Sequence, residues 1–246
     1  MKSLQIKNLK KINLKELVKN DSFFSARKEY KFIIQKKHML DVLNFLRDDF
    51  CFVVADDDSL TSAYESVYLD TEDYLFFNLH RVGKLKRIKI RTRLYKGGFG
   101  DQFIECKKKL SSLKVEKYRY KIEGDQILDP DLFEGELLKH GLKFADLKKE
   151  TTVNYNRINL ISNDLSEKVT LDFDLNAQNQ NGEVSFLGNY FILEVKSRSF
   201  PKKIAKFLKT NYRVQENGFS KYCIALCLLN KDLKKAKWKH IFKKYL

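Results

Sequence analysis

The stretch from Lys84 to Leu94 carries residue types that could do chemistry. Side chains of a β-strand alternate between its two faces. A strand here places Arg87, Lys89, Arg91 and Arg93 on one face and Ile88, Ile90 and Leu94 on the other. Arginine and lysine neutralise phosphate through charge-assisted hydrogen bonds, which arginine often makes in pairs. The stretch is therefore suited to hold a polyanion with one face while the other packs into a core.

Several other segments repeat this alternation of charged and apolar positions. Their charged faces hold Arg27, Glu29 and Lys31; Glu105, Lys107 and Lys109; Lys117, Arg119 and Lys121; Arg157; Lys168, Asp172 and Asp174; and Glu194, Lys196 and Arg198. These faces could point to water, as in an ordinary sandwich, or into a basic interior. We favour the basic interior because helices are available to cover apolar outer faces. Cations for phosphate and carboxylates for a divalent metal also meet the needs of phosphoryl transfer.

The elements that would position these residues are mostly strands. We expect strands over residues 27–34, 50–54, 66–69, 84–94, 102–109, 114–122, 151–160, 168–175 and 190–197. We expect helices over 36–49, 73–80, 201–210, 220–229 and 233–243, short helices within 125–149, and a polar loop over 176–183. Asp73 would cap the helix at 73–80. These segments supply roughly eight strands for one sheet, and successive strands often lack a crossover helix. The predicted fold class is therefore α+β, a closed antiparallel eight-stranded β-barrel tunnel with flanking helices.

The composition indicates one main core and an anionic partner. The chain has 246 residues, 43% of them hydrophobic, which suits a single substantial domain. Its 48 Lys+Arg against 32 Asp+Glu give a formal charge of +16, which favours nucleic acid, an anionic membrane surface or phosphate compounds. Four cysteines without a CxxC pair indicate buried free thiols rather than a zinc site.

The ends of the chain predict two flanking helices. Apolar residues at helical spacing indicate a basic amphipathic helix over residues 3–19. We therefore divide the chain into an N-terminal amphipathic helix at 1–20, a main domain at 21–230 and a C-terminal basic helix at 231–246. The N-terminus lacks an apolar signal core, and the longest apolar run is too short to span a bilayer, so we expect a cytoplasmic protein.

Eight short motifs, in order along the chain, resemble those of one family. They are Arg27-Lys-Glu29-Tyr-Lys31, Val67-Tyr-Leu-Asp70-Thr, Arg87-Ile-Lys-Ile-Arg91-Thr-Arg93, Phe103-Ile-Glu105-Cys-Lys107, Tyr155-Asn-Arg157, Thr170-Leu-Asp172, Leu193-Glu194-Val-Lys196 and Phe219-Ser220-Lys221-Tyr222. Over roughly residues 25 to 230 the sequence resembles the VTC (vacuolar transporter chaperone) domain. That domain is the polyphosphate polymerase branch of the triphosphate tunnel metalloenzymes.

The resemblance implies transfer of the γ-phosphate of ATP to a growing polyphosphate chain inside a basic tunnel, with Mn²⁺ or Mg²⁺. It implies catalytic roles for Lys221, Arg91, Arg93 and Arg157, and Glu194 as the metal ligand. The phosphate-binding set, extended by the strand alternation, is Lys31, Arg81, Arg87, Lys89, Lys107, Lys117, Lys168 and Lys196. Arg81 and Lys221 depend on the resemblance alone, and Lys168 stands where the family usually has arginine.

Several alternatives stay open. Three carboxylates could assist metal binding or only orient cations: Glu29, Glu105 and Asp172. Glu194 could simply pair with Lys196, and Lys221 could be a solvated lysine at a helix start. The hydrolase branch opens with two glutamates before the lysine, whereas this chain has Arg27-x-Glu29-x-Lys31, which favours a polymerase over a triphosphatase. The third interpretation is a non-catalytic polyphosphate-binding protein. We do not expect a nucleic-acid partner because no known motif is visible, and a membrane partner is left open.

Overall fold

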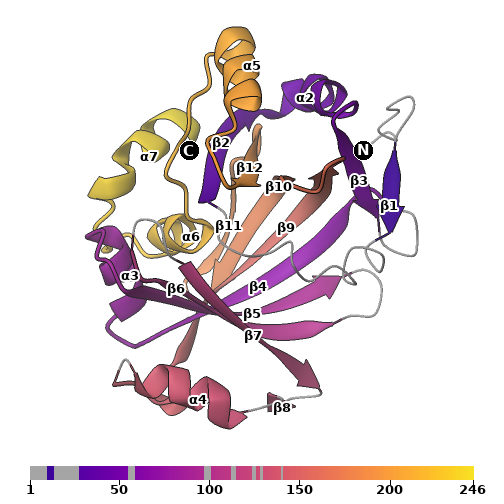
Figure 1. The fold of residues 1–246 in the computed structure, drawn as a ribbon. Helices are drawn as coiled ribbons and strands as arrows, with labels where there is room; N and C mark the ends of the chain where they lie inside the picture. The colour runs from indigo at the N-terminus through magenta and orange to yellow at the C-terminus, as the bar shows by residue number, and fades with distance from the viewer. Residues whose placement is uncertain are drawn as a thin grey trace.

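The computed structural model describes residues 10–13, 28–54, 59–96, 101–111, 115–123, 126–127, 130–139 and 141–246. Figure 1 shows one strongly curved sheet with helices on its outer face and within its curve. Eight strands follow one another across the sheet, and each pairs antiparallel with the next. In spatial order they are β2 (Lys28–Gln35), β12 (Tyr190–Ser197), β10 (Lys168–Asn179), β9 (Lys148–Ser162), β4 (Ser62–Asp70), β5 (Arg87–Lys96), β6 (Gln102–Lys109) and β7 (Val115–Glu123). The predicted α+β fold with eight antiparallel strands is confirmed.

The curved sheet is not closed by hydrogen bonds, in contrast to the closed barrel that the sequence predicted. In the part of the chain that the structure describes, the order runs from β2 past β7 to the short β8 (Gln126–Ile127), and β2 pairs with neither of them. Hydrogen-bonded strands must lie about 4.8 Å apart. Near the open edges of the sheet, contacts between charged side chains of the inner face take the place of strand pairing. Lys107 on β6 reaches Glu29 on β2, with 2.5 Å between Nζ and Oε1.

Two segments form strands where the sequence predicted other structure. β1 (Lys11–Asn13) pairs in parallel with β3 (Phe50–Val54), so the helix expected over residues 3–19 is wrong for these three residues. The rest of that expected helix lies outside the described residues. The polar loop expected over 176–183 is also wrong, because β10 continues to Asn179 and forms a hairpin with β11 (Gly182–Phe186). β11 is mostly exposed, which explains its loop-like composition.

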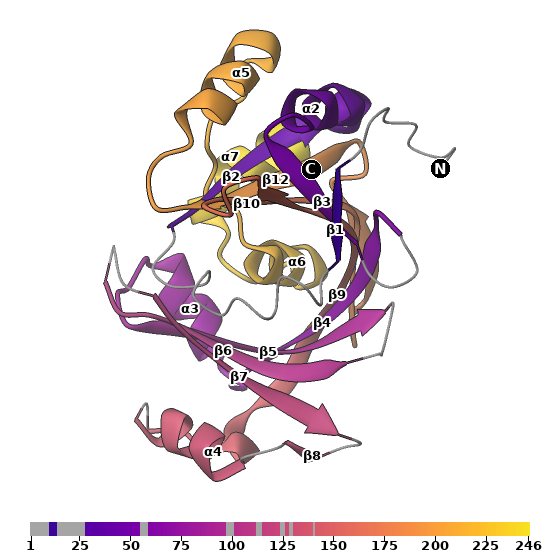
Figure 2. The ribbon, with the colours of Figure 1, turned by 45° about the vertical axis from the view of Figure 1, so that its right-hand side comes forward.

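The outer face of the sheet is apolar and is covered by helices. α2 (Met39–Leu46), which follows the 3-10 turn η2 (Lys36–His38), and α5 (Lys202–Tyr212) pack against β2, β9, β10 and β12. α4 (Pro130–Leu138) brings Phe133 and Leu137 against Ile88 and Ile104, and the 3-10 turn η3 (Phe144–Asp146) follows it. Figure 2 shows α2 and α5 above the sheet and α4 below it. The charged faces of these strands are therefore turned inward, as we expected.

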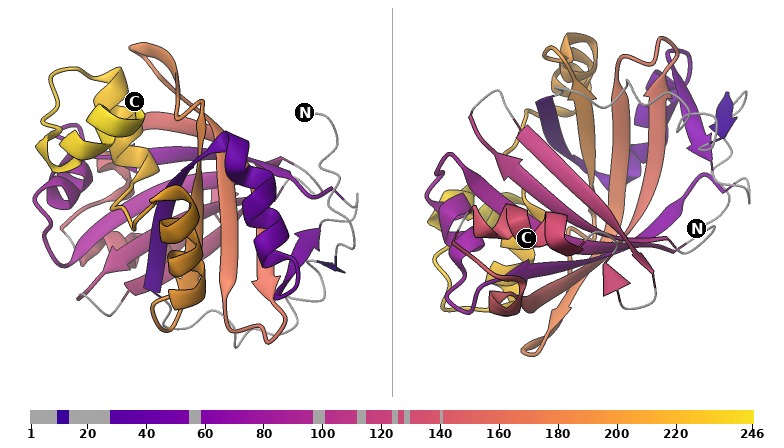
Figure 3. Two further views of the ribbon diagram at one scale, coloured as in Figure 1. Left: turned by 90° about the horizontal axis from the view of Figure 1, so that it is seen from above. Right: turned by 60° about the horizontal axis from the view of Figure 1, so that its bottom comes forward.

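Part of the inner face is apolar and holds α6 (Lys221–Leu229). This helix is hydrophobic all round, which is typical of a fully buried helix. Its Tyr222 and Ile224 share one buried cluster with Tyr68, Val153 and Ile192. α3 (Leu75–Arg81), the 3-10 turn η4 (Ala236–Trp238) and α7 (Lys239–Tyr245) complete this side (Figure 3). α6 thus fills one region of the interior and leaves the remainder to charged side chains.

The C-terminal segment packs onto the main core, while the domain boundaries themselves stay a prediction. Trp238 and Ile241 are buried in the same cluster as α6. All four cysteines are free, three of them fully buried, which confirms the expectation of free thiols. No helix in the described ranges has the length and hydropathy needed to cross a membrane.

Asp70, and not the predicted Asp73, caps α3. The Asp70 carboxylate is fully buried and accepts hydrogen bonds from the backbone N–H groups of Phe76 and Phe77 and from the Tyr222 hydroxyl. Asp73 instead accepts from the Thr71 hydroxyl. A carboxylate at the end of β4 therefore joins this strand to α3 and α6.

Replacing Asp70 by asparagine should lower the free energy of unfolding by about 2–3 kcal/mol, because the amide leaves buried donors unsatisfied. Urea denaturation measures the change. The matched control is Asp73→Asn, at an exposed position, which should cost no more than about 0.5 kcal/mol. Equal losses in the two variants would contradict this role for Asp70.

Candidate active site

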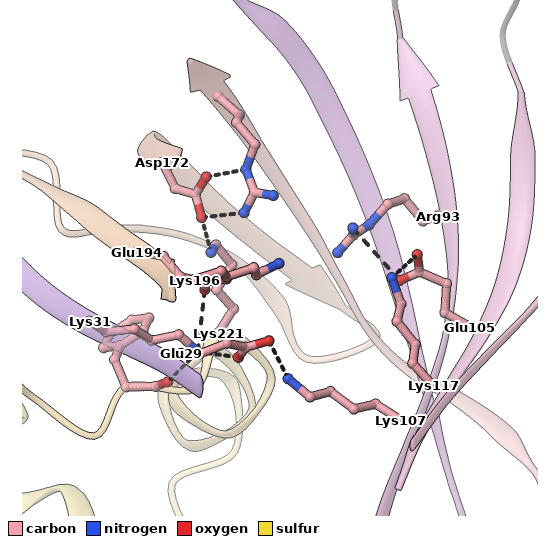
Figure 4. Close-up of polar contacts among 12 residues, drawn as sticks. Glu29, Lys31, Arg93, Glu105, Lys107, Lys117, Asp172, Glu194, Lys196 and Lys221 are labelled. Atoms are coloured by element: carbon pink, nitrogen blue, oxygen red, sulfur yellow. Dashed lines mark hydrogen bonds and ion pairs between the residues drawn. The ribbon is translucent and has the colours of Figure 1, made fainter. Parts of the chain in front are cut away.

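Strand register turns one set of charged side chains toward a common interior. Figure 4 shows Lys31 from β2, Lys107 from β6, Lys117 from β7, Lys196 from β12 and Lys221 from α6 approaching a shared space with four carboxylates. Cross-strand pairing places Arg91 opposite Glu105, Asp172 opposite Arg157, and Glu194 opposite Lys31. Cations outnumber carboxylates here, so the described interior carries excess positive charge. Three clusters organise it.

The deepest cluster is centred on Asp172. Its fully buried carboxylate accepts two hydrogen bonds from Arg157, at 2.5 Å from Nε and 2.8 Å from Nη2, and pairs with Lys221. Burial alone would raise the pKa of Asp172, but Arg157 and Lys221 lower it to about 2. The ammonium of Lys221 also lies 4.7 Å from the centre of the Tyr155 ring. Lys221 is therefore not a solvated lysine, and Asp172 orients two of the predicted catalytic cations.

The second cluster is centred on Glu105, whose side chain is buried. Arg91 binds it at 2.8 Å through Nε and 2.7 Å through Nη2, and Lys117 approaches to 3.1 Å. Arg93 lies farther away, at 3.6 Å, and its buried Nε has no hydrogen-bond partner in the described structure. Burial would raise the pKa of Glu105, but the arginines and Lys117 hold it far below its usual value. Arg93 keeps donor capacity that a phosphate could use.

The third cluster holds two carboxylates around one lysine. Lys31 Nζ lies 3.4 Å from Glu194 and 3.7 Å from Glu29, while Lys196 approaches Glu194 to 3.3 Å. Burial and the charge of Glu194 would raise the pKa of Glu29, but Lys107, Lys31 and Lys196 lower it to about 2. Both carboxylates are therefore ionised at neutral pH. The expected alternative for Glu194, pairing with Lys196, is present in this structure.

Lys168 and Lys89 are predicted phosphate-binding cations that have no carboxylate partner among the described residues. The side chain of Lys168, on β10, makes no hydrogen bond or ion pair with a described residue. The ammonium of Lys89, on β5, donates within the described ranges only to the Ser220 hydroxyl, at 2.9 Å. Burial and neighbouring cations lower the pKa of each to about 7. A phosphate placed beside them would restore the charged form.

We therefore expect the affinity for tripolyphosphate to fall as pH rises from 7 to 9, because free Lys168 loses its proton over this range. The variant Lys168→Arg keeps its charge, so its affinity for tripolyphosphate should fall less steeply with pH. The ratio of the two affinities should change by up to about tenfold per pH unit. Calorimetric titration without metal measures both. Lys206→Arg, on the exposed side of α5, is the control. Parallel pH profiles for the unmodified protein and Lys168→Arg would contradict the assignment.

Arg81 and Arg87 stand apart from the three clusters. Arg81 lies on α3 and donates to Asn78 of the same helix, and its role in phosphate binding stays a prediction. Arg87 donates to the carbonyl of Lys84 at the start of β5. Strand alternation missed Ser220, which caps α6 and accepts from Lys89. Ser220 could have been found from the sequence, because it stands directly before Lys221 in the motif Phe219-Ser220-Lys221.

The donor set fits a divalent cation only together with phosphate. The described residues contain no group of three or more Asp, Glu, His or Cys side chains that could hold a metal. Mg²⁺ commonly binds one or two carboxylates and completes its shell with substrate phosphates and water. Glu194 and Glu29 supply two ionised carboxylates beside Lys31. A metal here would therefore arrive with, or be completed by, the phosphate substrate.

Eight antiparallel strands thus form a curved sheet whose described inner face is lined largely by cations. The family model of the VTC domain matches residues 26–230 of this sequence. The chain therefore belongs to the VTC domain family. No curated protein matches the sequence.

Solved structures share the fold at low sequence identity. A putative adenylate cyclase from Bacillus halodurans is 12% identical, with a TM-score of 0.54, and the match covers 79% of this chain and 94% of that one. A protein from Pyrococcus horikoshii is 16% identical, with a TM-score of 0.44 and coverage of 82% and 98%. A putative adenylyl cyclase from Hippeastrum, described as having a dominant triphosphatase activity, is 12% identical, with a TM-score of 0.44 and coverage of 80% and 94%.

Proposed function

We propose that this protein is a metal-dependent polyphosphate polymerase that transfers the γ-phosphate of ATP to the end of a polyphosphate chain. One observation carries the proposal: the interior of a VTC domain gathers more buried cations than its carboxylates neutralise. Lys168 and Lys89 have no acidic partner in the described structure, and Arg93 keeps an unpaired buried donor. Such a site gains stability when a chain of phosphates enters it.

The mechanism follows from where the cations lie. Arg91 and Arg93 on β5 and Arg157 on β9 can hold phosphate oxygens by charge-assisted hydrogen bonds. Lys221 projects from the start of α6 beside Asp172, where it can neutralise charge that develops on the transferring phosphoryl group. Asp172 and Glu105 keep these cations in place. Fixed cations around donor and acceptor lower the barrier chiefly by positioning and electrostatic stabilisation.

Glu194, with Glu29, would hold the divalent metal, either Mn²⁺ or Mg²⁺. When bound, the metal would neutralise phosphate charge and orient the phosphate groups. With the metal on these carboxylates, the ammonium of Lys31 would lose its ion pairs with them and could bind phosphate instead.

The variant Glu194→Gln should require at least about tenfold more metal for half-maximal activity, because one ionised ligand is lost. Its maximal rate should fall as well. Titration of Mn²⁺ at saturating ATP measures both quantities. Glu183→Gln, at an exposed position on β11, is the matched control. An unchanged metal requirement would remove Glu194 from the metal site.

The direct test incubates the purified protein with ATP and Mn²⁺, with and without a short polyphosphate primer, and separates products by length. A ladder of long chains together with ADP supports the polymerase. Orthophosphate without chain growth would identify a triphosphatase. Binding without nucleotide turnover would identify a polyphosphate-binding protein.

The polymerase is favoured over the triphosphatase by family membership and by one sequence departure. Where the hydrolase branch has two glutamates before the lysine, this chain keeps only Glu29 in Arg27-x-Glu29-x-Lys31. Fewer carboxylates leave the tunnel more basic, which suits a long polyanionic product. Nucleic acid stays a disfavoured partner, and a cytoplasmic location is part of this proposal.

A further inference from the structure

The cationic lining continues beyond the candidate active site toward the surface. In the pairing of β5 with β6, Lys89 lies opposite Lys107 and Arg87 lies opposite Lys109. These two cross-strand pairs share the inner face with Arg91. They follow one another toward the start of β5 and the end of β6, so each step away from the clusters adds two cations.

The outer part of this extension differs from the active site in that no carboxylate of the described residues pairs with its cations. Arg87, Lys89 and Lys109 form no ion pair with any described residue, whereas Lys107 at the inner end still pairs with Glu29. Cations in direct cross-strand pairs repel each other and are destabilising without a counter-charge. Burial and the charge of Arg87 lower the pKa of Lys109, as expected for neighbouring cations. No described carboxylate therefore compensates the charges of Arg87, Lys89 and Lys109.

The C-terminal segment supplies the next cation. Lys237, on η4, donates to the carbonyl of His80 at 2.6 Å, which places it beside the loop before β5. Buried Trp238 packs against Phe77 and holds η4 in position. Its ammonium lies near Gly83, in the turn between α3 and β5. Burial and the charges of Arg87 and Lys109 lower the pKa of Lys237. Figures 1 and 3 show α3 and α7 together on this side of the sheet.

The surface past Lys237 is strongly basic. Residues 231–246 contain seven lysines and one acidic residue, and they lie outside the part of the chain that matches the VTC domain. The lysines of this segment are exposed: Lys231, Lys234, Lys235, Lys237, Lys239, Lys243 and Lys244. A row of cations thus leads from the interior toward a basic surface that lies outside the residues matched by the family model.

We propose that Lys89, Arg87, Lys109 and Lys237 form an exit track that guides a long polyphosphate chain from the tunnel to the C-terminal basic surface. The inference rests on the proposed function and names the path of its product. A linear polyphosphate carries about one charge per unit and is narrow enough to lie along the inner face of β5 and β6. A bilayer could contact the exposed lysines but could not reach Lys89 inside the sheet, so the continuous path favours a flexible, narrow polyanion.

The test compares binding of long polyphosphate with binding of tripolyphosphate, without ATP or metal, to the full chain. Tripolyphosphate fits the inner clusters and is too short to lie along the whole track. The double variant Lys109→Gln/Lys237→Gln removes two track charges that have no place in the catalytic set. The matched control, Lys206→Gln/Lys209→Gln, removes two exposed charges from α5 on the outer face.

We expect the double variant to bind long polyphosphate about tenfold more weakly at low salt, with the slope of log affinity against log salt reduced by about 2. Its affinity for tripolyphosphate should not change, and the control variant should match the unmodified protein. If the double variant lost the same affinity for long polyphosphate and for tripolyphosphate, or lost none for either, the exit track would be contradicted. A loss confined to single-stranded nucleic acid or to vesicles of anionic lipid would also overturn it.

A second measurement separates this inference from the proposed function. If the protein synthesises polyphosphate, the double variant should release ADP at the normal rate with a short primer while making shorter chains. Unaltered product length would overturn the track and leave the polymerase intact. If the protein makes no polyphosphate, the binding comparison still tests the track on its own.

Discussion

Replacing Arg93 by alanine should lower kcat/KM with ATP and polyphosphate by about 10²–10³, the usual loss when one preorganised charge-stabilising donor is removed. Arg93 is 6% exposed, its Nε lacks a partner in the described structure, and it lies 3.6 Å from the carboxylate of Glu105. Its guanidinium is therefore only partly committed to the protein. A phosphate is the natural acceptor for the remaining donors.

The fold should survive the loss of Arg93. Glu105 keeps Arg91 at 2.7 Å and Lys117 at 3.1 Å, so its buried charge stays compensated. Steady-state kinetics and a thermal unfolding curve on the same preparation separate the two effects. Arg93→Lys keeps the charge without the planar pair of donors and should lie between the unmodified protein and Arg93→Ala.

The matched control is Lys121→Ala, which removes an exposed cation on β7 that pairs with Glu123. Its activity should stay within about threefold of normal, because a solvated ion pair is worth little. Full activity in Arg93→Ala would exclude Arg93 from the site. Unfolding of Arg93→Ala would show that its role is structural instead.

The variant Asp172→Asn should lower the free energy of unfolding by about 3–5 kcal/mol, because it leaves Arg157 and Lys221 as an uncompensated buried pair of cations. Asparagine has nearly the same volume, so no cavity forms. Urea denaturation at neutral pH measures the loss. Added tripolyphosphate should restore part of it, since an anion that binds only the folded state stabilises that state.

The effect should depend on pH in a defined direction. The pKa of Asp172 falls from 3.8 to about 2 on folding, so its stabilising contribution is complete above the unfolded value. As pH falls from about 4 to about 2, the unmodified protein loses this contribution. The difference in the free energy of unfolding between the unmodified protein and Asp172→Asn should therefore become smaller as pH falls from about 4 to about 2.

Asp174→Asn provides the control on the same strand. Asp174 is partly exposed, pairs with Lys36, and has a positive φ of 53°, a conformation that asparagine tolerates well. Its replacement should cost less than about 1 kcal/mol. Comparable losses at positions 172 and 174 would show that burial of the Asp172 pair does not matter.

Alternation along single strands was sufficient to predict much of the architecture. β6 and β12 have the predicted bounds, and the row from Arg87 to Arg93 lies on one face, as expected. Such patterns are readable because side-chain direction in a strand depends only on the local backbone. The segment of β11 was expected to be a loop because most of its side chains are exposed, so it lacks the apolar alternation that marks a strand.

The sequence by itself determined the cationic faces, the apolar outer faces and the motif order that indicates the family. Only the tertiary structure decided which carboxylate meets which cation, and that the described sheet stays open. Glu29 and Lys107 lie 78 residues apart, and Asp172 and Lys221 lie 49 apart. These ion pairs depend on the curvature of the sheet and on the position of α6 inside it. The spacing of apolar and charged residues along single segments predicts neither.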